Sequence, residues 1–298
     1  MNRREALAGW GFAAPALSLL ACFMILPFGA ALVWSFTDYR LGSPLSVSWV
    51  GLQAYGRAWS DPAFQHAVLN NACFAAMVVP VQTALALLVA LFLQDRWPGI
   101  GLVRSLFVMP VVYPMALVAV VWLLLYSPGP QGQVNALVEV LSFGAWRADN
   151  DQGLLTEPRT ALPAIALLSI WQGLGFQLVI LLAGLQDVPR ALHEAAALDG
   201  AGPWQRFRQV TLPALRGPLT FTVLVTAILA FRLFDQVRIM TQGGPEYATT
   251  TMMYEAYRAG HQRGAVGQAA AMSVILFVIV CSLTLLPRLW RRPRAVAA

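Results

Sequence analysis

The sequence contains no lysine, and all 20 of its basic residues are arginine. A P-loop needs its lysine on the nucleotide phosphates, and Schiff-base catalysis needs a lysine amine. This chain can carry out neither chemistry. If nucleotide hydrolysis accompanies its function, another chain must supply it.

Charged residues, cysteine and histidine are also scarce. Asp, Glu and Arg together make up 11% of the chain, whereas an ordinary soluble domain carries about 25% charge. The cysteines Cys22, Cys73 and Cys281 are isolated in apolar runs, and the three histidines are scattered, which suggests neither a zinc site nor a disulfide framework. No pattern indicates a nucleophile or an acid/base pair. We therefore predict no catalytic residue, no metal and no cofactor in the chain itself.

Long apolar runs dominate what is present. Hydrophobic residues make up 58% of the chain, and a helix needs about 20 apolar residues to cross a bilayer. The first run is too long for a typical signal-peptide core and is not followed by an Ala-x-Ala site, so we interpret it as a retained span. We predict an all-α polytopic membrane protein with six transmembrane helices. They lie at roughly 11–36, 67–94, 105–127, 162–186, 214–239 and 266–287.

The distribution of arginine predicts the orientation, because cytoplasmic loops carry an excess of basic residues. With the N-terminus inside, 12 arginines lie in the cytoplasm and 7 outside, and Arg232 falls within the fifth span. The inner set is Arg3, Arg4, Arg96, Arg104, Arg190, Arg206, Arg208, Arg216, Arg288, Arg291, Arg292 and Arg294. The outer set is Arg40, Arg57, Arg147, Arg159, Arg238, Arg258 and Arg263.

This orientation defines the predicted organisation. Residues 1–10 form a cytoplasmic N-terminus, 11–287 a six-span transmembrane domain, and 288–298 a cytoplasmic basic tail, so both termini are cytoplasmic. The basic isoelectric point is then explained by the arginines of the cytoplasmic loops and tail. We therefore predict no nucleic-acid partner.

A polar segment at 187–216 falls on the cytoplasmic side. An acid and a proline at 187–189 favour a helix start. Gly200 suits the position after a helix end, where positive φ is needed, and Pro203 can begin a second helix. We predict two short helices with a bend at 200–202. The pattern alone leaves open whether they form a solvated surface element or a helix that docks in a partner's groove.

The same segment carries a motif. The string Glu194-Ala195-Ala196, then Asp199-Gly200-Ala201, then Leu212-Pro213 resembles the EAA loop of ABC importer membrane subunits. The runs 170–189 and 231–245 resemble the carbohydrate-uptake branch of that family, with its larger maltose-type, glycerol-3-phosphate and trehalose permeases. The resemblance covers about residues 10–288 and implies the six-span form of a type I ABC importer permease fold. By resemblance, the ATPase-coupling positions are Glu194, Ala195, Ala196, Asp199, Gly200 and Ala201.

The resemblance also implies partners. A coupling helix docks in a groove of a separate ATPase, and two ATPase subunits would hold ATP and Mg. A second, homologous permease subunit would complete a heterodimer, and an extracytoplasmic solute-binding protein would deliver solute. The chain itself would be a multi-pass protein surrounded by lipid in the bacterial plasma (inner) membrane.

Polar residues inside two predicted spans are candidates for a solute pathway, because such groups are costly in a bilayer. Arg232 and Asp235 are three residues apart, which on a continuous helix puts them on one face; a structural salt bridge between them is the alternative. A second polar and aromatic cluster comprises Trp171, Gln172, Gly173, Phe176 and Gln177. Resemblance to the maltose-type subunit implies sugar contacts from Gln172, Gly173, Phe176, Phe231, Arg232 and Asp235, and we add Gln177 to this predicted pathway.

The predicted outer loop Thr241-Gln242-Gly243-Gly244-Pro245 resembles the family's TxGGP turn. Two glycines and a proline favour a rigid, tight turn. We expect Gly243, Gly244 and Pro245 to shape the outer face that meets a binding protein. A loop that only reverses the chain is the alternative.

These features predict the permease subunit of a binding-protein-dependent ABC importer. Its solute would be a sugar, such as a disaccharide or oligosaccharide, or a related polyol phosphate such as glycerol-3-phosphate, moved by ATP-driven alternating access. The alternative is an ion-driven secondary transporter that acts alone. That alternative predicts inverted repeats and acids near the bilayer midplane, and Asp235 is the only acid placed inside a predicted span.

Overall fold

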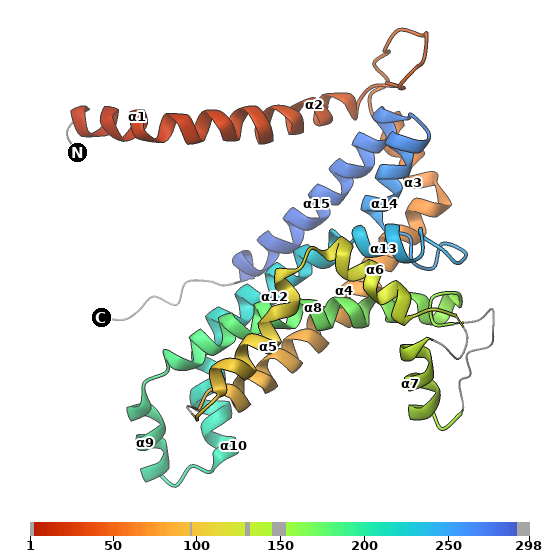
Figure 1. Ribbon diagram of the computed structural model, residues 1–298. Coiled ribbons are helices and arrows are strands. Elements are labelled where there is room, and N and C mark those ends of the chain that lie inside the picture. Colours follow the sequence, from red (N-terminus) through yellow and green to blue (C-terminus); the bar gives the residue numbers. More distant parts are fainter. Residues whose placement is uncertain (1–2, 96, 129–131, 145–152, 291–298) are drawn as a thin grey trace. The chain divides into compact units, whose positions relative to one another are not determined.

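The computed structural model describes residues 3–95, 97–128, 132–144 and 153–290. Regular structure in these ranges is helical, and the isolated bridge between Thr37 and Trp49 belongs to no strand, as Figure 1 shows. The described residues confirm the all-α prediction. Some arginines that were used to predict the orientation lie outside them, namely Arg96, Arg147, Arg291, Arg292 and Arg294.

The helices pack into two compact units. The first contains the described residues within 1–65 together with Glu255–Ile279, and the second contains His66–Tyr254 and the described residues from Val280 onward. Elements of the first unit are α1 (Arg3–Leu20), a π-helical stretch (Ala21–Ile25), α2 (Leu26–Trp34), α3 (Gln53–Ser60), the start of α4 (Pro62–Leu93), the end of α14 (Met252–Tyr257), a π-helical turn (Arg258–Gln262) and the first part of α15 (Val266–Trp290).

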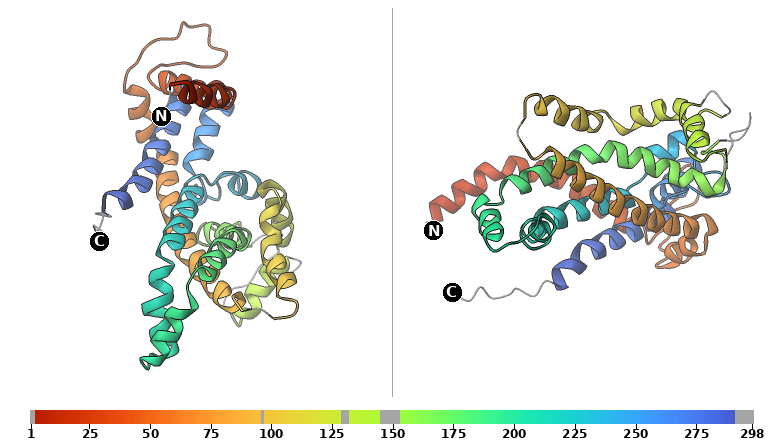
Figure 2. Two further views of the ribbon diagram at one scale, coloured as in Figure 1. Left: turned by 90° about the vertical axis from the view of Figure 1, so that its left-hand side faces the viewer. Right: turned by 90° about the horizontal axis from the view of Figure 1, so that it is seen from below.

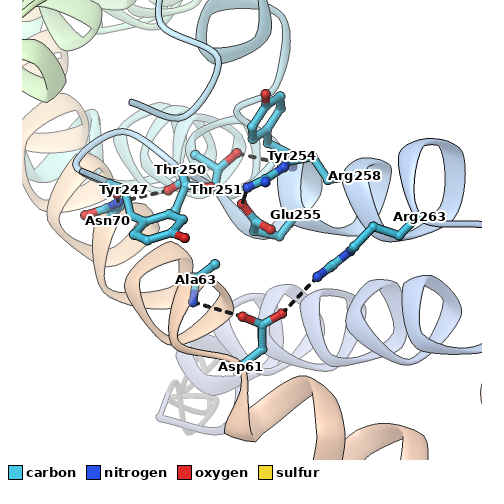
Figure 3. A network of polar contacts seen from close by, with 10 residues as sticks. All are labelled: Asp61, Ala63, Asn70, Tyr247, Thr250, Thr251, Tyr254, Glu255, Arg258 and Arg263. Atoms are coloured by element: carbon cyan, nitrogen blue, oxygen red, sulfur yellow. Dashed lines mark hydrogen bonds and ion pairs between the residues drawn. The ribbon is translucent and has the colours of Figure 1, made fainter. Parts of the chain in front are cut away.

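Within the first unit, the chain after α2 is tied to the start of α15. The Leu41 N–H donates to the Gly264 carbonyl at 2.7 Å, and the Gly267 N–H donates to the Tyr39 carbonyl at 3.0 Å. A Cβ at Gly267 would clash with a neighbouring backbone carbonyl, so glycine permits this close approach. Arg263 also pairs with Asp61 at an N···O distance of 3.4 Å (Figure 3).

The second unit is built around α8 (Pro158–Gln186). Its Ile165, Leu168, Leu178 and Leu181 side chains are fully buried, and Figure 2 shows α8 among α4, α5 and α12. The other elements of this unit are α5 (Ile100–Val112), α6 (Met115–Leu125), α7 (Gln133–Leu141), α9 (Arg190–Leu198), α10 (Pro203–Arg206), a π-helical turn (Phe207–Thr211), α11 (Leu212–Ala214), α12 (Arg216–Phe231) and α13 (Asp235–Met240).

A glycine sets the close packing of α5 on α8. A Cβ at Gly175 would clash with the Phe107 carbonyl oxygen and would lie 2.8 Å from the Val108 Cα. Small residues at helix contacts let backbones approach closely in membrane proteins. The side chains around this contact, including Leu178 and Leu181, then close an apolar core toward the end of α8.

Five of the described helical segments are long and apolar enough to cross a membrane: Gly9–Trp34, Pro62–Leu93, Pro158–Gln186, Arg216–Met240 and Val266–Leu285. The remaining predicted span, the third, at 105–127, is a broken pair, because α5 and α6 meet at a bend of 98°. Pro114 lies at the break, and Tyr113 before it has an extended backbone (φ −81°, ψ 140°). A residue before proline is pushed out of the helical region, which explains the break.

Candidate functional site

The fifth predicted span is interrupted beside the centre of the second unit. Helix α12 ends at Phe231, the next three residues leave the helix, and α13 begins at Asp235. Phe234 has φ −144° and ψ −59°, outside the helical region. Arg232 and Asp235 therefore do not share the face of one continuous helix, and that part of the sequence-based argument is wrong.

Both residues nevertheless line one cavity. It has a volume of about 400 Å³ and receives side chains from α4, α5, α6, α8, α12, the break and the start of α13. Most of its wall is apolar, from Phe74, Val78, Val111, Met115, Phe176, Leu229, Ala230, Leu233 and Phe234. Its polar groups are Gln82, Ser169, Gln172, Thr226, Arg232, Asp235 and Gln236. An apolar cavity with a few converging polar groups is typical of a small-molecule site.

The structure brings together most of the predicted pathway residues. Gln172, Gly173, Phe176, Arg232 and Asp235 all line the cavity. The other two do not: Phe231 is buried at the end of α12, and Gln177 is fully buried in α8. The Gln177 amide donates to the Thr226 hydroxyl, so it connects α8 to α12 behind the cavity wall.

The charges at the break are left facing the cavity. Arg232 and Asp235 are both exposed, both lie in the described part of the chain, and no ion pair joins them. The structural salt bridge considered above is thus not formed. One positive and one negative group beside the Phe74, Phe176 and Phe234 rings can together bind a solute with hydroxyl groups and apolar ring faces.

Gln172 and Gly173 are positioned by their neighbours. The Gln172 amide nitrogen donates to the Tyr113 carbonyl at 3.0 Å, at the break between α5 and α6. A carbonyl freed by a broken helix needs such a partner in an apolar environment. A Cβ at Gly173 would lie 2.7 Å from the Gln82 amide nitrogen, so glycine makes room for that side chain.

Sequence reasoning missed four polar lining residues: Gln82, Ser169, Thr226 and Gln236. The Gln236 amide donates to the Ser169 hydroxyl at 3.2 Å across the cavity wall. Gln82 was the most detectable, because it is an isolated amide in an apolar run at 74–93. Ser169 and Thr226 gave no signal, since such residues also satisfy their own helix carbonyls within spans.

The predicted pair of short helices forms as expected. Helix α9 ends at Leu198, Gly200 adopts a φ of +80°, and α10 begins at Pro203. Figure 1 shows α9 and α10 projecting beyond the ends of α8 and α12. Glu194, Ala195, Asp199 and Gly200 are exposed, while Ala196 and Ala201 are half-buried. The structure of this segment is confirmed; its coupling role stays a prediction.

The predicted tight turn at 241–245 is also formed. Gln242 and Gly243 have φ values of +52° and +84°. The Thr249 hydroxyl donates to the Gly244 carbonyl at 2.7 Å and also contacts the Thr241 hydroxyl at 2.7 Å. Gly243 is buried, and Gly244 and Pro245 are half-buried. Side-chain bonds across the turn hold its conformation, while its rigidity and its contact with a binding protein stay predictions.

No group of three or more His, Cys, Asp or Glu residues that could hold a metal ion occurs among the described residues.

Comparison with known proteins places this geometry among transport components. Residues 64–292 match the family described as "Binding-protein-dependent transport system inner membrane component". The trehalose/maltose transport system permease protein MalF of Thermococcus litoralis is 31% identical over 285 residues, which cover 96% of this chain and 94% of that protein. The sn-glycerol-3-phosphate transport system permease protein UgpA of Yersinia pestis is 31% identical over 274 residues, or 91% of this chain and 90% of that protein.

The fold is also found in solved transporters. A chain of a bacterial alginate ABC transporter, in complex with an alginate pentasaccharide-bound periplasmic protein, matches 95% of this chain and 93% of its own length with a TM-score of 0.79 at 19% identity. A chain of a bacterial ABC transporter involved in the import of alginate matches 97% of this chain and 98% of its own length with a TM-score of 0.78 at 21% identity.

Proposed function

Because the chain belongs to the family of binding-protein-dependent transport system inner membrane components, we propose that it moves a carbohydrate or an anionic polyol through the cavity at the break of its fifth span. The family makes it a multi-pass inner membrane protein and a transport subunit of an ABC importer, not an enzyme.

The observation that carries this proposal is the chemistry of the cavity. Arg232 and Asp235 face it without pairing to each other, beside the Phe176 and Phe234 rings. Hydroxyl groups bind well to charged partners, and aromatic rings stack on the apolar faces of sugars. An arginine also suits a phosphate or carboxylate. Relatives named for trehalose and maltose or for sn-glycerol-3-phosphate support the same solute class.

We further propose that α9 is the docking helix for an ATPase. Exposed Glu194 lies on this helix next to small alanines, exposed Asp199 directly follows its end, and Leu192 and Leu198 are 51% and 90% exposed. A short helix with small and apolar exposed residues suits a groove on a partner. The absence of lysine agrees with this proposal, in which the partner chain and not this one binds and hydrolyses ATP.

The complete importer in this proposal contains a second permease subunit, two ATPase subunits and an outer binding protein. One chain supplies one docking helix and one set of cavity-lining residues. The binding protein presents solute on the outer side, and ATP binding closes the ATPase pair. That closure moves the docking helices and turns the cavity from the outer to the inner side.

Uptake by reconstituted vesicles tests the proposal. Vesicles that contain the full assembly should accumulate labelled trehalose, maltose or sn-glycerol 3-phosphate only when ATP and the binding protein are both present. Omitting either component should abolish uptake. Accumulation by this chain alone, driven by a proton or sodium gradient, would instead support an independent secondary transporter.

A further inference from the structure

The break in the fifth span is held by a side chain from a distant helix. Asn71 of α4 is fully buried, and its amide nitrogen donates to the carbonyls of Ala230 and Phe231 at 3.1 and 3.3 Å. These carbonyls belong to the last turn of α12, where i→i−4 partners run out, and the Ala230 carbonyl keeps only a long bond from the Leu233 N–H at 3.4 Å. In a membrane span such groups must be satisfied inside the protein. Asn71 supplies the partner that lets α12 stop here.

The other end of the same amide holds a third segment. The Met252 N–H donates to the Asn71 side-chain oxygen at 2.9 Å, at the start of α14. Next to it, the fully buried Thr251 hydroxyl donates to the Leu233 carbonyl inside the break at 2.8 Å. The break is thus fixed from two sides, by Asn71 and by Thr251, and Asn71 joins α4, α12 and α14.

Asn70, which precedes Asn71 in α4, bonds to a different segment. Figure 3 shows Asn70 beside Tyr247 and Thr250, and its amide nitrogen donates to their carbonyls at 2.7 and 3.0 Å. It therefore holds the segment that follows the outer turn and not the break itself. Only Asn71 of this pair bears on the position of the residues that face the cavity.

Helix geometry shows what the break achieves. Each residue of an α-helix turns the chain by about 100°. On α12 the cavity-facing residues are Thr226, Leu229 and Ala230. Were the helix unbroken, Asp235 would lie about 180° from Thr226 and would not face the cavity. Arg232 keeps its helical N–H bond to the Ile228 carbonyl at 3.2 Å, so its direction does not depend on the break. Val237 would lie about 20° from Thr226 and would face it instead.

We propose that Asn71 is a positioning residue of the solute pathway. It does not line the cavity, but it stabilises the break that turns Asp235 toward the solute. This inference rests on the proposed function of the cavity. Loss of the amide favours continuation of α12 through the break, because the freed carbonyls then regain helical N–H partners.

A thiol reporter at Val237 tests the geometry without any solute. Val237 is fully buried in the present arrangement, and the unbroken helix would turn it into the cavity. In full-length protein whose native cysteines are replaced by alanine, Val237→Cys should react slowly with a charged methanethiosulfonate reagent. Adding Asn71→Ala should raise the rate by at least about tenfold, since exposure of the thiol limits its reaction.

Asn135 provides a matched control. It is also fully buried, its amide nitrogen donates to the Tyr126 and Ser127 carbonyls, and its oxygen accepts from the Leu154 N–H. Asn135→Ala therefore removes the same kinds of bond away from the break and should leave the Val237→Cys rate unchanged. Asn71→Ser, which keeps one donor, serves if Asn71→Ala does not accumulate in the membrane. An unchanged rate in folded Asn71 variants would overturn the proposal.

A double-mutant cycle tests the link to solute. In the assembled importer, Asn71→Ala should lower ATP-driven uptake of labelled trehalose, maltose or sn-glycerol 3-phosphate by at least about tenfold. In an Asp235→Asn background the same substitution should cost less than about twofold, because coupled residues are not additive. Equal losses in both backgrounds would make Asn71 merely structural. If the wild type imports none of these probes, the proposed function fails, while the thiol reaction still decides the geometry.

Discussion

Asp235 owes its place in the cavity to a single interruption of the backbone. It is the first residue of α13, it is exposed, and no ion pair joins it to Arg232. A carboxylate in that position is free to accept hydrogen bonds from a solute's hydroxyl groups. Its charge is therefore expected to contribute to transport and not to the stability of the helix bundle.

Removing this charge should weaken transport. In the assembled importer, Asp235→Asn should reduce uptake by about tenfold, the effect expected for loss of a charge-assisted hydrogen bond of about 1.5–3 kcal/mol. The amount of protein in the membrane should not change. Glu157→Gln, at the exposed start of α8 and away from the cavity, is the control. Wild-type uptake kinetics in Asp235→Asn would remove this residue from the pathway.

Glycine has a packing role at Gly175 that the composition alone does not reveal. Gly175→Ala should force α5 away from α8, because the new Cβ meets the Phe107 carbonyl and the Val108 Cα. We expect a loss of about 1–3 kcal/mol, typical of overpacking, measured as a lower midpoint of thermal unfolding in detergent. Gly217→Ala in α12 has no heavy atom within 4 Å of the new Cβ and should be neutral or slightly stabilising. Equal midpoints for the two variants would contradict the packing argument.

Among the elements, local signals predicted the helix pair α9–α10 and the turn at 241–245. Pro189, Gly200 and Pro203 act through their own backbone preferences, so neighbouring residues suffice to place the bend. Pro114 is a local signal of the same kind for the bend between α5 and α6, although the length and hydropathy of 105–127 predict an unbroken span. Each of these features is encoded within a few residues of where it occurs.

The break at 232–234 could not be predicted in this way. It contains neither glycine nor proline, and it is stabilised by Asn71 and Thr251, which lie far from it in the sequence. Sequence spacing brought Arg232 and Asp235 to one face for the wrong reason, since a continuous helix would have turned Asp235 away from the cavity. Gln82 and Ser169 were missed because α4 and α8 meet the break only in the folded chain.

Helix α9 is the element on which energy coupling is expected to depend. Glu194→Lys reverses a charge on its exposed face, and a like-charge or unpaired contact at a docked interface costs several kcal/mol. ATP-driven uptake should fall by at least about tenfold, and less ATPase should co-purify with the membrane subunits. Asp95→Lys reverses an exposed acid on the same predicted side of the membrane and should have little effect. Normal uptake and co-purification in Glu194→Lys would remove this residue from the coupling role.

For the whole molecule, the orientation in the membrane connects all of these assignments. The excess of arginine in the predicted inner loops, 12 against 7, favours a cytoplasmic N-terminus. This predicted orientation would put α9 on the side where an ATPase can bind and the turn at 241–245 on the side where a binding protein can bind. If the orientation were reversed, both docking assignments would fail together, so it is the most informative single property to measure.

Two introduced cysteines measure it. Leu198 in α9 is 90% exposed, and Glu246 beside the outer turn is also exposed. In a background with Cys22, Cys73 and Cys281 replaced by alanine, an impermeant thiol reagent added to intact cells with a permeable outer envelope should label Glu246→Cys and spare Leu198→Cys. Inside-out vesicles should give the opposite pattern, because each thiol then faces the other compartment. Labelling of Leu198→Cys from the outside would contradict the orientation and, with it, the docking of an ATPase on α9.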